Sequence, residues 1–292
     1  MVKRSINSNE QLITYETFSE FEKMLKQPMI SGRDDSSESG SSSFCGTRSW
    51  EQAEEFRMFG DKESAAAINR FKSKLDNAME KVVQEKTRNY NDVAGFQPIV
   101  PNAIMNLPIS MINQKRVIKK GKVIKLHCDM GFRAGTDKDD IAYRGALILS
   151  VIDEYERQGY RIELSAGVSA MGNDGECVGF VFPIKQAGQP LNILKVAYYI
   201  VNPSFLRRTY FRFCEVETHI DNITSGYGKQ TQDSSRLTTL QNFIGGDTVV
   251  INATYMPSER DGDEKNIKKL TKLIDKQLEA LKKKSEKKRT RN

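Results

Sequence analysis

The alternation of hydrophobic and polar positions predicts an α/β core in the middle of the chain. Residues 123–130 form an apolar run typical of a buried strand, and residues 141–158 have the spacing of a helix. Further strands are expected at 160–170 and 177–184, joined by the turn sequence Asn-Asp-Gly at 173–175. The helix makes the first two strands parallel, whereas the short turn makes the second and third antiparallel. We therefore expect an α/β fold with a mainly parallel open sheet and one antiparallel edge hairpin.

Amphipathic helices are expected on both sides of this core. Residues 15–27 and a basic segment near the C-terminus each carry an apolar stripe at helical spacing. Another helix is expected from about residue 62 to residue 88, followed by a proline-containing connector over 96–109 that should be extended and packed. The stripes of the two terminal helices are candidate surfaces for docking a partner. Their residues are Phe18, Phe21, Leu25, Ile267, Leu270, Ile274, Leu278 and Leu281.

This pattern divides the chain into five parts. Residues 31–43 contain seven serines and two glycines, which cannot support a core, so they are expected to form a flexible linker. The linker would tether an N-terminal helical arm loosely, which suits a docking role. The other expected parts are the arm itself (1–30), a helical region with the connector (44–121), the α/β core (122–258), and a basic C-terminal helix and tail (259–292).

Positive charge is concentrated at the C-terminal end. The whole chain has a net charge of +7, but residues 265–292 hold twelve Lys or Arg against three acids, which leaves the rest at −2. Arginines also alternate with aromatic residues over 205–213, which fits either single-stranded nucleic acid or a core element whose arginines pair with acids. The candidate nucleic-acid-binding residues are Arg207, Arg208, Arg212, Lys282, Lys283, Lys284, Lys287, Lys288, Arg289 and Arg291.

The composition indicates a folded protein that is not secreted. Hydrophobic residues make up 38% and charged residues 28% of the 292 positions, which is ordinary for a globular protein. No apolar stretch is long enough to span a bilayer, and the first residues lack the apolar segment of a secretory signal. The four cysteines lie far apart without metal-binding spacing, so reduced, buried thiols are expected. A cytoplasmic protein without a membrane partner is the resulting expectation.

No catalytic motif is complete in the sequence. The glycine patterns that bind nucleotide phosphates are absent. His127 and Cys128 are neighbours in a predicted strand, so they point to opposite faces and cannot act as a pair. Four aspartates near the end of the first core strand indicate either a hydrolytic metal site or helix capping with one carboxylate paired to Arg133. These residues are Asp129, Asp137, Asp139 and Asp140.

Three segments carry a resemblance to known families. Residues Val123 through Leu164, which include Arg144-Gly-Ala-Leu and Gly159-Tyr-Arg-Ile-Glu, resemble the opening of von Willebrand A-like domains. Together with Gly46-Thr-Arg-Ser-Trp-Glu-Gln-Ala and the connector from Val100 to Pro108, they are similar to a family of tailed-bacteriophage proteins. The similarity covers about half of the chain. It implies a Rossmann-like sheet and a viral protein made in a bacterial host, and it supplies no catalytic residues.

The same segment departs from the metal-binding pattern of von Willebrand A-like domains. Those domains carry Asp-x-Ser-x-Ser after the first strand, whose oxygens hold Mg²⁺. Here the sequence reads Asp129-Met-Gly131-Phe-Arg133, so both hydroxyls are missing and an arginine, which repels a metal cation, stands at the last position. We expect this degenerate site to bind no metal, and we expect no cofactor elsewhere.

These observations favour a non-enzymatic interaction protein over two alternatives. The chain would bind another protein of the phage or of the host, with self-association also open. It would act in the cytoplasm of the infected cell, or with the virion, as an assembly factor or as an inhibitor of a host enzyme or defence system. One alternative is a nucleic-acid-binding accessory protein that uses the basic C-terminal helix. The other is a metal-dependent hydrolase centred on Asp129.

Overall fold

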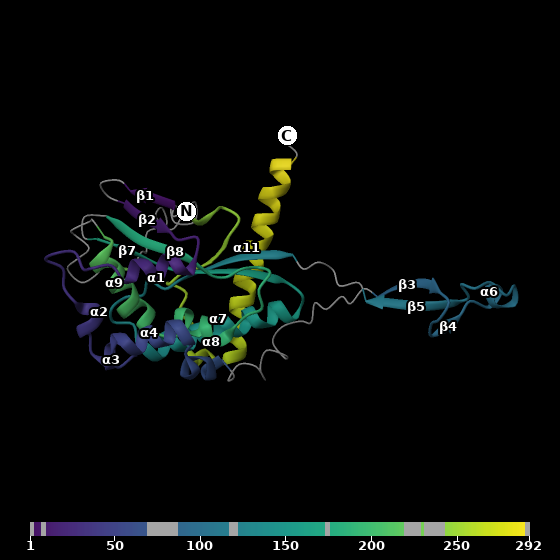
Figure 1. Ribbon diagram of the computed structural model, residues 1–292, viewed down its shortest axis with the longest axis horizontal. Helices are drawn as coiled ribbons and strands as arrows, with labels where there is room; N and C mark the ends of the chain where they lie inside the picture. The colour runs from purple at the N-terminus through teal and green to yellow at the C-terminus, as the bar shows by residue number, and fades with distance from the viewer. Residues whose placement is uncertain are drawn as a thin grey trace.

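Helices pack against a main β-sheet, and a small second sheet lies apart from it (Figure 1). Apolar residues of the main sheet and of its helices meet in one large core. Among the described residues, those of the second sheet contribute nothing to this core. The computed structural model describes residues 3–6, 10–68, 87–116, 122–172, 176–218, 229–230 and 243–289.

Five neighbouring strands of the main sheet have the predicted arrangement. In the order β2-β8-β7-β6-β10, every adjacent pair is parallel except β7–β8. The predicted α/β class with a mainly parallel sheet is therefore confirmed. The β7–β8 hairpin is not at an edge, because β2 pairs with the outer side of β8 and β1 follows β2. The strands are β1 (Lys3–Ile6), β2 (Glu10–Thr14), β6 (Val123–Asp129), β7 (Arg161–Met171), β8 (Cys177–Lys185), β9 (Lys229–Gln230), which pairs with β7, and β10 (Val249–Ile251).

The helices pack closely on this sheet and on each other. Helix α7 contacts β7 and α8, and α11 contacts α7 and β10. The crossing of α7 and α8 depends on Gly145, because a Cβ there would lie 2.0 Å from the Ile200 carbonyl oxygen. The C-terminal end of α11 extends beyond the sheet (Figure 1). The helices are α1 (Phe18–Leu25), α2 (Ser36–Ser39), α3 (Ser42–Cys45), α4 (Trp50–Phe59), α7 (Lys138–Arg157), α8 (Ile193–Ile200), the π-helical η1 (Phe205–Tyr210), α9 (Phe211–Val216), the 3-10 turn η3 (Glu259–Asp261) and α11 (Asp263–Arg289).

The N-terminal segment is part of the core, contrary to the prediction of a tethered helical arm. Strand β2 pairs in parallel with β8 and so joins the main sheet. On the following helix, the Phe21 ring stacks on the Phe182 ring with centroids 4.2 Å apart. Leu25 is buried in the same core, and Phe18 packs against it. Helical spacing in the sequence predicted α1, but α1 packs against β8, which lies far along the chain.

A small antiparallel sheet forms a projection that we call the arm, residues 87–116. Strand β5 lies between β3 and β4, and the short helix α6 lies at the far end (Figure 1). The arm requires Gly95, because a Cβ there would lie 2.1 Å from the Ile112 carbonyl oxygen. Its elements are β3 (Thr87–Asp92), β4 (Gln97–Pro98), α6 (Val100–Ile104) and β5 (Met111–Arg116).

Two predictions for this region need correction. The helix expected from residue 62 to about 88 is present over 62–68, while 69–86 lie outside the described residues and 87–92 form β3. The connector was expected to be extended and packed, but it contains α6 and most of its residues are exposed. Pro101 stands in the first turn of α6, where its missing N–H costs no helical hydrogen bond.

Candidate functional site

Asp129 ends strand β6, and its carboxylate is enclosed by the chain. The residue is 2% exposed. Its Oδ1 accepts a hydrogen bond from the Gly131 N–H at 3.0 Å, and its Oδ2 accepts one from the Ser169 hydroxyl at 3.4 Å. Burial raises the pKa of Asp129, and main-chain hydrogen bonds lower it only in part. Because both oxygens are engaged inside the protein, this carboxylate is placed to fix the loop after β6.

The charges around Asp129 differ from those expected. Arg133 is exposed, and the structure forms no ion pair between these two described residues. The nearby cation is Arg144 of α7, which is fully buried. Its guanidinium ties the end of β6 to the segment after β10 and is therefore used for structure. It donates, at 2.8–3.3 Å, to the main-chain carbonyls of Asp129, Ile251, Asn252 and Tyr255.

The other three aspartates of the acidic group serve helix α7. Asp137 is its N-cap, and the side chain accepts a hydrogen bond from the Asp139 N–H at 2.8 Å. Asp139 and Asp140 are exposed in the first turn, where negative charge favours the helix dipole. In the part of the chain that the structure describes, no three His, Cys, Asp or Glu side chains form a group that could hold a metal ion. Of the two interpretations, capping is the one that the geometry supports.

His127 and Cys128 are buried in β6 and are unsuited to proton exchange near neutral pH. Burial lowers the pKa of His127 to about 3 and raises the pKa of Cys128 to about 12. The Nδ1 atom of His127 lies 3.0 Å from the Ser165 hydroxyl oxygen. All four cysteines are free and buried, as predicted.

The basic and aromatic segment 205–213 lies in the core, and its arginines bind the chain itself. Arg207 and Arg208 are 3% and 0% exposed. The Arg207 guanidinium lies 4.3 Å from the centroid of the Phe44 ring and donates to the Phe44 carbonyl at 2.6 Å. Neither guanidinium is therefore free to bind a phosphate. Arg208 donates, at 2.8–3.1 Å, to the Thr47 hydroxyl and to the carbonyls of Ser37, Glu38, Gly40 and Thr47.

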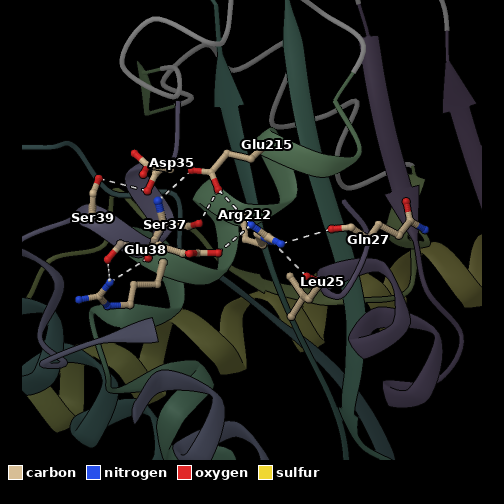
Figure 2. Close-up of polar contacts among 9 residues, drawn as sticks. Leu25, Gln27, Asp35, Ser37, Glu38, Ser39, Arg212 and Glu215 are labelled. Carbon is tan, nitrogen blue, oxygen red and sulfur yellow. Dashed lines mark hydrogen bonds and ion pairs between the residues drawn. The ribbon is translucent and has the colours of Figure 1, made fainter. Parts of the chain in front are cut away.

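Figure 2 shows how α9 holds the serine-rich segment. The buried Glu215 carboxylate accepts hydrogen bonds from the Ser37 N–H, at 2.8 Å, and from the Ser37 hydroxyl. Arg212 pairs with Glu38 at 3.1 Å and donates to two carbonyls at the end of α1. Segment 31–43 is therefore not the flexible linker that was predicted, because buried charged groups from a distant helix anchor it as α2 and α3.

The candidate docking stripe of α11 is also internal. Ile267, Leu270 and Ile274 are 0%, 0% and 1% exposed, and Leu278 and Leu281 pack partly buried against the same core. The stripe of α1 lies in that core as well. The structure thus corrects the expectation that these residues dock onto a partner, since β10 and α7 already cover the stripe of α11.

The basic end of α11 is exposed where the structure describes it. Lys282 and Lys283 are both exposed. A surface hollow of about 810 Å³ lies at the other end of this helix, lined by acids and lysines of residues 261–272. No helix among the described residues has the length and apolar character needed to cross a membrane. Five candidate positions lie outside the described residues or have side chains that do, namely Lys284, Lys287, Lys288, Arg289 and Arg291.

Exposed apolar side chains are concentrated at the end of the arm, which we call the arm tip, residues 93–109. The tip holds seven of the thirteen large hydrophobic residues that are exposed in the described chain. Its fold is fixed by main-chain hydrogen bonds such as Ile99 N–H to the Ser110 carbonyl at 2.7 Å. The seven are Val93, Phe96, Val100, Ile104, Met105, Leu107 and Ile109, with exposed fractions between 44% and 79%.

Sequence reasoning missed this surface, although the sequence carries a signal for it. Residues 93–114 contain no Asp, Glu, Lys, Arg or His. Surface loops normally hold charged residues, so a long uncharged and apolar stretch between strands indicates either burial or an interaction surface. In the structure this stretch is exposed and not buried.

Comparisons with known proteins place the chain in one family. The family model described as a domain of unknown function (DUF7192) matches residues 3–284. The chain belongs to the DUF7192 family. The match spans both the main sheet and the arm, so the two are parts of one DUF7192 domain. No curated protein and no solved structure shows significant similarity to the chain.

Proposed function

We propose that this DUF7192 protein is a non-enzymatic interaction protein that binds another protein through the arm tip. The observation that carries the proposal is the group of seven exposed apolar side chains on an uncharged, projecting loop. Folded proteins rarely expose a large contiguous apolar patch unless a partner covers it. The α/β core then acts as the scaffold that presents the arm.

The enclosed state of Asp129 supports a non-enzymatic role over hydrolysis. A metal-dependent hydrolase needs carboxylate oxygens that face the ligand and are ionised. At Asp129 both oxygens accept hydrogen bonds from the protein, and burial raises the pKa of the group. The exposed Arg133 adds positive charge to the same loop.

The proposed setting is the cytoplasm of an infected bacterium. The combined resemblance of residues 46–53, 100–108 and 123–164 to a family of tailed-phage proteins supports a viral origin. In that setting the chain serves as an assembly factor or blocks a host enzyme or defence complex. Both roles use the same surface, so one experiment addresses them together.

The proposal is tested by affinity purification of the tagged full chain from infected bacteria, followed by mass spectrometry. The test variant combines Ile104→Ser with Met105→Ser, two exposed tip positions whose change should leave folding intact. The matched control is Val123→Ser, which removes an exposed apolar side chain from the main sheet. We expect a partner with the wild type and the control but not with the tip variant. Identical partners for all three chains, or none for any, would refute the proposal.

Nucleic-acid binding is the second candidate, and the exposed Lys282 and Lys283 favour it. A basic helix end releases counterions when it binds phosphates, so affinity should fall steeply as salt rises. We expect truncation after Leu281 to abolish any DNA or RNA binding measured by fluorescence anisotropy. Binding that survives the truncation, or that is absent at low salt, would remove this candidate.

A further inference from the structure

Strand β10 forms one edge of the main sheet, and one of its residues faces outward. Among the described residues β10 pairs with β6 alone. Successive residues of a strand direct their N–H and C=O groups to opposite sides, so Val249 and Ile251 face β6 and Val250 faces away from it. An unpaired edge is a template for pairing with another chain, and natural proteins cover or shorten such edges.

The side-chain amide of Gln277 on α11 takes the place of a neighbouring strand. Its Oε1 accepts a hydrogen bond from the Val250 N–H at 2.9 Å, and its Nε2 donates to the Val250 carbonyl at 2.9 Å. A paired residue of an antiparallel strand would make the same two bonds. On either side of β10 the chain turns away, since the Thr248 N–H and the Asn252 carbonyl are both used in turns. The Gln277 amide therefore closes this edge at its one outward residue.

The first half of α11, residues 263–274, is fixed in the core. The Asp263 carboxylate accepts a hydrogen bond from the Tyr143 hydroxyl at 2.9 Å. Three apolar side chains of this half are at most 1% exposed, namely Ile267, Leu270 and Ile274. Exposing them would break the core, so this half should open only when the whole protein unfolds.

The second half of α11 is held by far fewer contacts. Among residues 275–283 none is fully buried, although Leu278 and Leu281 pack partly buried against the core. The Asp275 carboxylate accepts a hydrogen bond from the Tyr155 hydroxyl at 2.8 Å, and the Gln277 amide makes its two bonds to β10. Beyond these contacts the helix extends past the sheet (Figure 1).

We propose that residues 275–283 form a strap, which the Gln277 amide latches to the edge of the main sheet and which opens while the core stays folded. The closed strap keeps the outward groups of Val250 paired and so protects this edge from pairing with another chain. The open strap exposes that edge together with the basic end of α11. The strap is independent of the arm tip, so its failure would leave the proposed function untouched.

Native-state hydrogen exchange of the full wild-type chain, followed by NMR in low concentrations of urea, tests the strap first. We expect the amides of Val250 and of residues 277–283 to exchange at least about a hundredfold faster than those of residues 267–274. Their rates should depend only weakly on urea, because a local opening exposes little surface. The amides of residues 267–274 should show the strong urea dependence of global unfolding.

The variant Gln277→Met tests the latch itself. Methionine keeps an unbranched side chain and a high helix propensity, but it removes both hydrogen bonds to Val250. The amides of Val250 and of residues 277–283 should then exchange at least about tenfold faster, whereas those of residues 267–274 should keep their wild-type rates. The matched control is Lys276→Met, the same replacement at the neighbouring exposed position, which should change neither group.

Several results would overturn the strap. One is a wild type in which Val250 and residues 277–283 exchange only through global unfolding, with the urea dependence of the core. Another is a Gln277→Met chain in which these rates stay within about twofold of wild type. Equal acceleration of residues 267–274, or a Gln277→Met chain that does not fold, would show that Gln277 supports the whole fold and would also overturn it.

Discussion

Replacing Arg208 with methionine removes the side chain that anchors the serine-rich segment. The substitution keeps an unbranched side chain in place and deletes five donated hydrogen bonds, four of them to main-chain carbonyls. Arg208 is fully buried, so water cannot replace the lost donors without local opening. Each buried acceptor left without a donor lowers the free energy of unfolding by about 1–3 kcal/mol. Local opening of the segment lets water replace some of the donors, so the expected total is about 3–5 kcal/mol.

Urea unfolding at neutral pH measures this loss directly. The expected destabilisation is a large fraction of the roughly 5–15 kcal/mol that holds a typical domain together. The matched control is Arg161→Met on the exposed start of β7, which should change stability by less than about 0.5 kcal/mol. Hydrogen exchange should quicken at residues 36–47 in particular, because the Ser37 N–H is normally held by Glu215. An Arg208→Met protein within about 1 kcal/mol of wild type would refute the reasoning.

Three further expectations concern the core and the Asp129 loop. Burial lowers the pKa of His127 to about 3 in the folded chain, against 6.5 in the unfolded chain, so the unfolded chain binds a proton first as the pH falls. The free energy of unfolding should therefore decrease below pH 6.5. In urea titrations, His127→Gln should remove about 2 kcal/mol of the decrease between pH 7 and pH 5. Gly145→Ala should cost at least about 1–3 kcal/mol in thermal unfolding, whereas Gly135→Ala, in open space, should be neutral. Asp129→Ala should lower the free energy of unfolding by about 1–3 kcal/mol in urea, and Asp129→Asn should lower it less because the amide oxygen still accepts a hydrogen bond from the Gly131 N–H. Millimolar Mg²⁺ should not raise the melting temperature of the wild type.

The local part of the fold could be predicted from the sequence. Strands β6, β7 and β8 and helix α7 follow one another along the chain, so their apolar periods and the turn between β7 and β8 specify both order and direction. The stripe of α11 was equally clear. Each of these elements is recognised by its own residues, without knowledge of the partner it packs against.

The remaining part depends on contacts between distant residues. Strand β2 is only five residues long, and it becomes a strand because β8 pairs with it. Segment 31–43 has the composition of a linker, yet Arg208 and Glu215 supply the buried donors and acceptors that its main chain needs. Composition alone does not reveal such partners, since they lie far away in the sequence.

The sequence did not lead to the candidate surface for a related reason. Amphipathic stripes on α1 and α11 were assigned to a partner, although the same spacing is produced by packing onto the chain's own sheet. The proline-containing segment 96–109, which lies within the uncharged stretch 93–114, was predicted to be an extended and packed connector because of its prolines. Periodicity shows which face is apolar, and only the tertiary structure shows what covers it.

Site-specific photo-crosslinking in infected bacteria tests the central claim most directly. A photoreactive amino acid replaces either Ile104 at the arm tip or Arg133 in the loop after β6, both of them exposed. The account predicts strong protein crosslinks from position 104, to a second copy or to another protein, and few from position 133. Crosslinks concentrated at position 133, with none from position 104, would contradict it.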